Sequence, residues 1–213
     1  MKNNFPNTES VAIIANGCFE KSDYIKKKIN SFNYFVCCDG GLANLLKYNL
    51  EPNVIIGDLD SINEENKIKY KKKTIFIKNQ NENDLRKTIK WLSNKTINKA
   101  SIFFATGKRQ DHCIGNIFTL LQYETNLDIE IIGKYGDFSI INKTKTISSY
   151  KGQSISLFST DPTIFIRTKN LKYNLNGKLK NLYQGTLNES MSSNFKISIS
   201  HGKVLIYKEN ILN

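Results

Sequence analysis

Short apolar runs alternate with longer polar stretches of helical spacing through the first part of the chain, up to residue 132. The apolar runs are Val11–Ala15, Tyr34–Cys38, Asn53–Ile56, Thr74–Ile77, Ser101–Ala105 and Asp128–Ile132. The stretches with helical spacing are Ser22–Ile29, Leu42–Tyr48, Asp84–Leu92 and His112–Tyr123. Continuous apolar strands that alternate with helices are typical of a parallel sheet covered on both faces, so we expect an α/β fold here.

The pattern changes after Gly133–Gly136. The later apolar runs are short and alternating: Ser139–Ile141, Ser154–Phe158, Ile164–Ile166, Phe195–Ile199 and Val204–Tyr207. Asp-Pro, Asn-Gly and His-Gly turn signals separate them, and no helical stretch does. This pattern predicts an antiparallel sandwich or a small barrel. We therefore expect one domain at residues 1–136 and a second at residues 137–213.

The charge balance is strongly basic. Lysine and arginine number 31 against 19 aspartates and glutamates, a formal net charge of +12. Such a balance favours nucleic acid or an anionic membrane as a partner. Only Arg86, Arg109 and Arg167 are arginines, whereas nucleic-acid readers commonly use arginine for bidentate contacts. Abundant lysine, asparagine and isoleucine together are what an AT-rich coding sequence produces, so we expect no nucleic-acid partner.

The sequence also favours a cytoplasmic protein with no membrane partner. No apolar run approaches the roughly 20 residues needed to cross a bilayer, and Met1–Ser10 lacks the basic and apolar regions of a signal peptide. No two cysteines show C-x-x-C spacing, so we interpret all four as reduced thiols: Cys18, Cys37, Cys38 and Cys113.

Polar residues and glycines follow four of the predicted parallel strands, where ligands bind in open α/β sheets. These segments are Asn16-Gly17, Asp39-Gly40-Gly41, Gly57–Ser61 and Thr106–His112, and Asp84 begins a predicted helix nearby. The chain has no Walker motif, no Gly-x-Gly-x-x-Gly and no His-Glu-x-x-His. Any phosphate chemistry at these strand ends is therefore not of the common nucleotide-binding kinds.

Asp58 and Asp60 are two positions apart, directly after an apolar strand. In extended geometry both carboxylates share a face, and a cation would relieve their repulsion. Oxygen ligands without histidine or thiolate suit Mg²⁺. The alternative is a turn in which Asp60-Ser61 opens a helix over Ile62–Tyr70.

The other strand ends allow two interpretations as well. Gly40-Gly41 permits close backbone approach to an anion, or simply makes a turn. Arg109 suits charge on a transferring phosphate, whereas Asp111-His112 could cap the following helix. For His112 we prefer a structural or binding role over a role as a catalytic base.

These motifs together resemble the thiamine pyrophosphokinase family. The resemblance is carried by Cys38–Gly41, Pro52–Ser61, Asp84, Gly107–His112 with Asn116, and Gly185–Glu189 before His201-Gly202. It covers nearly the whole chain in order, and Gly57-Asp-Leu-Asp-Ser61 is its most specific part. Three residues depart from the family's usual pattern: Asn81 in place of an aspartate, Lys108 in place of a glycine, and Leu187 in place of a serine.

The resemblance implies a Rossmann-like three-layer α/β catalytic domain that binds ATP, followed by a β-sandwich that binds thiamine, in a homodimer. It implies Mg²⁺-dependent transfer of a diphosphoryl group from ATP to thiamine. The implied metal site is Asp58, Asp60 and Asp84, which also count as catalytic together with Arg109 and Asp111. Implied nucleotide-binding residues are Asn16, Gly17, Asp39, Gly40, Gly41, Thr106, Gly107 and His112. Implied thiamine-binding residues are Asn116, Leu187 and Asn188.

Two other classes of function stay open. One is a metal-dependent diphosphotransferase or nucleotide-binding protein of the same fold that acts on another alcohol. The other is a basic nucleic-acid-binding protein, which would bind oligonucleotides with steep salt dependence.

Overall fold

The computed structural model describes residues 9–79, 81–123 and 126–211. The chain divides into two compact units, and each is described by itself. The first unit comprises the chain to Thr119 and Tyr123–Gly133, and the second comprises Leu120–Gln122 and the chain from Lys134 onward. The boundary expected from the sequence, between residues 136 and 137, falls at the start of the strand Gly136–Ile141.

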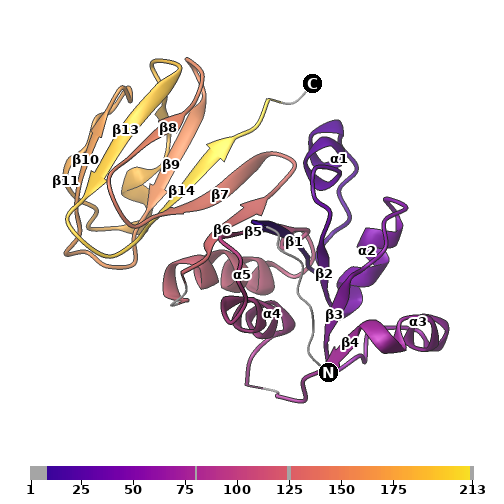
Figure 1. Ribbon diagram of the computed structural model, residues 1–213. Coiled ribbons are helices and arrows are strands. Elements are labelled where there is room, and N and C mark those ends of the chain that lie inside the picture. Colours follow the sequence, from indigo (N-terminus) through magenta and orange to yellow (C-terminus); the bar gives the residue numbers. More distant parts are fainter. Residues whose placement is uncertain (1–8, 80, 124–125, 212–213) are drawn as a thin grey trace. The chain divides into compact units, whose positions relative to one another are not determined.

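A parallel sheet forms the centre of the first unit (Figure 1). Its strands are β1 (Ser10–Ile14), β2 (Phe35–Cys38), β3 (Val54–Gly57), β4 (Thr74–Phe76), β5 (Lys99–Phe103) and β6 (Asp128–Ile132). They lie in the order β6-β5-β1-β2-β3-β4, and every neighbouring pair is parallel. The carboxyl ends of β1, β2, β3 and β5 therefore meet at one edge of the sheet, as the sequence predicts.

Helices cover both faces of this sheet. The helices are α1 (Asp23–Ile29), α2 (Leu42–Leu46), α3 (Glu64–Lys69), α4 (Asp84–Ser93) and α5 (Gln110–Gln122), with 3₁₀ turns at Asp39–Gly41 and Lys71–Lys73. Figure 1 shows α1 and α2 on one face and α4 and α5 on the other. The adjacent Cys37 and Cys38 follow this division: Cys37 packs in the core under α1 and α2, whereas Cys38 contacts Thr88 of α4. All four cysteines, which lie in the described ranges, are free thiols.

Capping side chains set where the helices begin. Ser22 caps α1 by accepting a hydrogen bond from the Ile25 N–H, and Asn83 caps α4 in the same way through the Arg86 N–H. Asn63 caps α3 by accepting from the Asn66 N–H. The alternative interpretation, in which Asp60-Ser61 opens this helix, is therefore wrong, because Asn63 takes that position three residues later.

The second unit is an antiparallel sandwich (Figure 1). Its strands are β7 (Gly136–Ile141), β8 (Lys145–Ser148), β9 (Ser154–Phe158), β10 (Phe165–Lys169), β11 (Asn176–Lys178), β12 (Asn188–Glu189), β13 (Asn194–Ile199) and β14 (Val204–Glu209), with a 3₁₀ turn at Leu182–Gly185. One sheet has the order β12-β9-β14-β7 and the other β11-β10-β13-β8. Inward residues of both sheets, such as Leu157, Ile166 and Phe195, form one buried core.

The observed architecture confirms the predicted fold class, an α/β unit followed by an antiparallel sandwich. Three short strands, β8, β11 and β12, are absent from the sequence prediction, because β8 and β11 are mostly exposed and polar and β12 has only two residues, both polar. The Asn176-Gly177 turn signal lies within β11 instead. In the part of the chain that the structure describes, no helix has the length and apolar character needed to span a bilayer.

Candidate active site

A cleft of about 650 Å³ lies at the carboxyl edge of the parallel sheet. It is lined by residues that follow three of its strands and by the start of α4: Asn16, Gly17, Asp58, Asp60, Asp84, Lys87, Thr106, Lys108, Arg109, His112 and Asn116. The structure thus brings most of the sequence-predicted residues of the first unit into one place. This position matches the general rule for ligand sites in open α/β sheets.

Three residues at the strand ends beside this cleft have left-handed backbone conformations. Asp39, Leu59 and Phe104 have φ values of 33°, 67° and 57°, and they follow the ends of β2, β3 and β5. A left-handed conformation is uncommon for residues other than glycine and costs on the order of 1–3 kcal/mol. Such strain persists where the surroundings hold the chain in place, and it is often found at functional sites.

Three carboxylates gather at the ends of β2 and β3. One oxygen from each of Asp39, Asp58 and Asp60 lies within 4.8 Å of the others. Asp39 also accepts a hydrogen bond from the Ser61 N–H at 3.2 Å, and the Ser61 hydroxyl donates to Asp60 at 2.9 Å. Asp39 therefore joins the pair that the sequence singled out as a metal site.

Asp39 is the buried member of this group, with 2% of its surface exposed. Its Oδ1 atom is buried and has no hydrogen-bond partner among the described residues. Burial raises the pKa of Asp39 to about 6, and the nearby Asp60 and Asp84 carboxylates act in the same direction. A buried acceptor without a donor, beside two further carboxylates, fits a divalent cation that prefers oxygen ligands, such as Mg²⁺.

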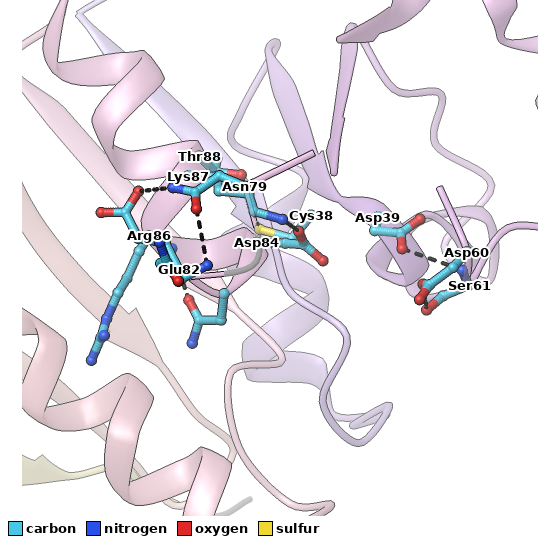
Figure 2. Close-up of polar contacts among 12 residues, drawn as sticks. Cys38, Asp39, Asp60, Ser61, Asn79, Glu82, Asp84, Arg86, Lys87 and Thr88 are labelled. Atoms are coloured by element: carbon cyan, nitrogen blue, oxygen red, sulfur yellow. Dashed lines mark hydrogen bonds and ion pairs between the residues drawn. The ribbon is translucent and has the colours of Figure 1, made fainter. Parts of the chain in front are cut away.

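Asp84 lies apart from this cluster. Figure 2 shows Asp39, Asp60 and Ser61 as one group, and Asp84, Lys87, Cys38 and Thr88 as another. Asp84 accepts a 2.9 Å hydrogen bond from Lys87, whose side chain is only 4% exposed. A buried ammonium needs such a partner. Asp84 thus has a cation of its own chain, the Lys87 ammonium, beside it.

Gly57 lies between the two groups, and because it has no side chain the groups can lie close together. A Cβ atom at this position would lie 2.7 Å from the Asp39 Cβ and 3.3 Å from Asp84 Oδ1. Any side chain there would push the carboxylates aside. Gly40 has a similar role, because its Cβ would lie 2.3 Å from Asn16 Nδ2.

The loop after β5 carries a second kind of charge arrangement. Arg109 donates two hydrogen bonds to Asp111, from Nε to Oδ1 at 3.2 Å and from Nη2 to Oδ2 at 2.6 Å. Arg109 lowers the pKa of Asp111 to about 2. The residue at the N-cap position of α5 is Arg109, and Asp111 lies within the first turn, so the interpretation of Asp111-His112 as the helix cap is wrong.

Neighbouring residues hold the remaining parts of the cleft wall. Lys108 donates to Asn16 Oδ1 at 2.9 Å, and the Gly107 N–H donates to the Cys113 sulfur at 3.1 Å. The buried Asn44 donates to the carbonyls of Ala15 and Gly17 at 3.2 and 3.1 Å, which fixes the loop after β1. Gly40 and Gly41 belong to the 3₁₀ turn that leads into α2.

Asn116 connects two elements of the site. It donates to the Ala105 carbonyl at 2.8 Å and accepts from the Asn83 side chain at 3.2 Å. Asn83 in turn caps α4, the helix that begins with Asp84. The Asn116 side chain is therefore engaged in holding α4 against the end of β5.

The two residues predicted to bind thiamine in the second unit differ in character. Asn188 is buried, and its side chain is bonded to backbone groups: it donates to the Tyr173 carbonyl at 2.7 Å and accepts from the N–H groups of Tyr173 and Glu189. Leu187 is 90% exposed and has a φ of 59°. An exposed leucine in a left-handed conformation is unusual for both reasons.

Sequence reasoning missed Lys87 and Asn83. Lys87 lies three residues after Asp84, at the spacing at which helical side chains meet, so this spacing could have identified the pair. Asn83 directly precedes a helical pattern, which is a recognisable cap signal. The sequence analysis also assigned Asp39 to the nucleotide-binding residues and not to the acidic pair. The spacing along the chain does not show that the ends of β2 and β3 are neighbours.

Comparison with known proteins agrees with this arrangement. Residues 25–132 match the family model "Thiamin pyrophosphokinase, catalytic domain", and residues 136–207 match "Thiamin pyrophosphokinase, substrate-binding domain". The first match contains β2 to β6 and the carboxylate cluster.

Individual relatives are similar as well. A thiamine pyrophosphokinase of Bacillus subtilis (strain 168) is 32% identical over 101 residues, which cover 45% of this chain and about half (47%) of the relative. The crystal structure of thiamine pyrophosphokinase from Bacillus subtilis has a TM-score of 0.80 at 23% identity and covers 95% of this chain and 100% of that one. The enzyme from Candida albicans has a TM-score of 0.77 at 20% identity, with coverages of 95% and 89%. The structural likeness establishes the fold. Because the catalytic-domain model matches half of the sequence, the chain belongs to the thiamin pyrophosphokinase family.

Proposed function

We propose that this chain transfers the diphosphoryl group of ATP to the hydroxyl group of thiamine, giving thiamine diphosphate and AMP. The observation that carries the proposal is that Asp58, Asp60 and Arg109 line one cleft within the region matched by the catalytic-domain model. In this reaction the hydroxyl oxygen bonds to the β-phosphorus and releases its proton to the surrounding water. The bond from that phosphorus to the oxygen bridging toward the α-phosphorus breaks, and its electron pair leaves with AMP.

The carboxylate cluster suits the divalent cation that such a reaction uses. Asp39, Asp58 and Asp60 would hold Mg²⁺, with the unpartnered Oδ1 of Asp39 as a ready acceptor. Mg²⁺, when bound, neutralises negative charge on the phosphates. Asp84, which the family resemblance implies as a third ligand, pairs with Lys87, and we propose that this pair borders the phosphates.

Arg109 and Asp111 are proposed to act as a pair. The guanidinium is exposed at the cleft and can hydrogen-bond a phosphate oxygen while Asp111 holds it from the other side. Because its pKa is about 2, Asp111 stays ionised at neutral pH and is a weak proton acceptor. We therefore assign Asp111 the orientation of Arg109 rather than removal of the hydroxyl proton.

The second unit is proposed to contribute to thiamine recognition through Leu187. Its left-handed backbone presents an apolar side chain to the exterior, a costly arrangement that a ligand contact would explain. Leu187→Gly relieves the backbone cost and removes the side chain. We expect a higher KM for thiamine, unchanged KM for ATP, and unfolding free energy that is equal or higher by up to about 1 kcal/mol. An unchanged KM for thiamine would remove Leu187 from the site.

The decisive experiment is product analysis. Purified chain with Mg²⁺, ATP and thiamine should give AMP and thiamine diphosphate in equal amounts. Formation of ADP with thiamine monophosphate, or no product, would overturn the proposal. Replacing thiamine by other primary alcohols tests the alternative of a related diphosphotransferase, which is favoured if another alcohol gives a higher kcat/KM.

We also propose that the chain works as a homodimer in the cytoplasm, as the family resemblance implies. Sedimentation velocity at micromolar concentration should give about twice the chain mass of 24.4 kDa. A single species of monomer mass under assay conditions would contradict the dimer.

A further inference from the structure

The outer face of the sheet β11-β10-β13-β8 carries a groove of about 340 Å³, distinct from the cleft of the first unit. Figure 1 shows these four strands as one layer of the sandwich. The groove is lined by residues of β10 and β13 and of the segment leading into β11, among them Arg167, Lys169, Asn176, Lys196 and Ser198. Its volume is in the range of small-molecule sites.

The groove is lined by positively charged side chains, and the strands that form it carry no acidic ones. Arg167, Lys169 and Lys196 are exposed, and none has a carboxylate partner among the described residues. The four strands of this sheet contain no aspartate or glutamate. An anion is therefore the ligand that this groove would attract.

Strand register places two of the cations side by side. β10 and β13 are antiparallel, with Lys169 directly opposite Lys196 and Arg167 opposite Ser198. Like charges directly opposite each other on a sheet destabilise it. A bound anion would convert this repulsion into two attractive contacts.

Arg167 is oriented before any ligand binds. Its Nε donates to Asn176 Oδ1 at 3.1 Å, and its guanidinium lies over the Phe165 ring at 5.4 Å. These contacts occupy Nε and one face of the guanidinium, and the terminal nitrogens make no hydrogen bond to the described residues. They can therefore form the paired hydrogen bonds that phosphate oxygens accept. A pre-oriented fork loses less freedom on binding.

We propose that this groove binds a compact polyphosphate group, held by the Arg167 fork and by Lys169 and Lys196. The size of the groove and the close spacing of its cations favour a diphosphate or triphosphate over a long polymer. The site lies entirely within the second unit and is independent of the proposed transferase activity.

The test uses inorganic triphosphate as the probe, with the full chain in a buffer without divalent cations. Calorimetry gives the affinity, and amide chemical shifts of the ¹⁵N-labelled chain give the location. We expect the largest shifts at Arg167–Lys169 and Lys196–Ser198. Absence of binding, or shifts confined to the loops at Asp58 and Arg109, would overturn the proposal.

Variants separate a built site from general charge. Lys169→Gln with Lys196→Gln should weaken triphosphate binding at least about tenfold, because two charge-assisted contacts are lost. The matched control, Lys151→Gln with Lys180→Gln, removes the same charge from exposed lysines outside the groove and should leave the affinity nearly unchanged. Equal weakening by both pairs would show general charge attraction only and would contradict the site.

Two further arms address the ligand itself. Arg167→Lys keeps the charge but removes the fork, so weaker binding supports the proposed geometry, and unchanged affinity contradicts it. A single-stranded oligonucleotide is compared at the same salt concentration. Tighter binding of the oligonucleotide, with shifts that extend beyond the groove, would replace the compact anion by a nucleic acid and overturn the proposal.

Discussion

The carboxylate cluster at β2 and β3 and the cationic groove on β10 and β13 both concentrate charge of one sign, but they are built differently. The cluster rests on strained backbone and a buried aspartate, with Gly57 required for close approach. The groove lies on regular strands, and its lysines are exposed. Water screens exposed charges well and buried charges poorly. The stability and activity that depend on the cluster should therefore respond strongly to protonation and to a bound cation. The stability of the groove should respond only weakly to a change of charge.

The largest expected effect comes from removing one charge of the cluster. Asp58→Asn should lower turnover on the order of 10²-fold or more, because it removes a carboxylate of the proposed metal site. Stability should be unchanged or higher, since a like-charge repulsion is also removed. AMP formation and urea unfolding measure the two effects. Asp128→Asn, at an exposed site of β6, is the control, and near-normal turnover of Asp58→Asn would exclude Asp58 from the metal site.

A second substitution tests whether Asp39 and Asp84 must lie close together. Gly57→Ala should cost about 1–3 kcal/mol of unfolding free energy and much of the activity, because its methyl group meets Asp39. Gly115→Ala is a matched control at the other side of the site. Nothing lies within 4 Å of a Cβ there, so this helical position should gain about 0.5–1 kcal/mol. A harmless Gly57→Ala would show that Asp39 and Asp84 are free to move apart.

The pH dependence of stability tests the burial of Asp39. Its pKa is about 6 in the folded chain, above the ordinary value of 3.8, so the folded state binds the proton more tightly than the unfolded state. Asp39 therefore favours folding when protonated, and this contribution is lost as the pH rises from about 4 to about 6.

Urea unfolding without divalent cations measures this effect. Across that interval the unfolding free energy of the wild-type chain should fall relative to Asp39→Asn, which carries no charge at either pH. Parallel pH profiles of the two proteins would contradict the raised pKa.

The smallest effect is expected in the groove. Lys196→Glu places opposite charges across from each other on β10 and β13 and should raise the unfolding free energy by about 0.2–1 kcal/mol. The same substitution at Lys151, which is exposed outside the sheet, serves as the control in urea unfolding. A loss of stability on Lys196→Glu, with no loss in the control, would show that Lys169 and Lys196 do not repel each other.

Prediction from the sequence succeeded where the signal is local. The runs at residues 128–132 and 154–158 are strands with the predicted bounds, and Ser22 begins the helix that its position indicates. Asp58 and Asp60 were identified because they stand together after one strand. The strand β12, of only two residues, has no periodicity to detect.

Prediction from the sequence is weakest where distant segments meet. Asp39 joins Asp58 and Asp60 because β2 and β3 are parallel neighbours, with Cys38 beside Ile56. The role of Asp84 as a metal ligand stays a prediction, and the structure adds Lys87, three residues later on the same helix, as its charge partner. The predicted role of Asn116 as a thiamine contact stays untested, and the structure shows its amide bound to Ala105 and Asn83.

Neighbouring residues alone thus specify the class of fold, the order of its strands and helices along the chain, and the acidic segment Gly57–Ser61. Periodicity, caps and turns are properties of short segments, so they can be read without a structure. The sequence alone does not show that Asp39 lies beside Asp58 and Asp60, or that Lys169 lies opposite Lys196. These contacts depend on strand order and register. Packing between segments far apart in the chain sets both, so only the folded structure brings these charges together.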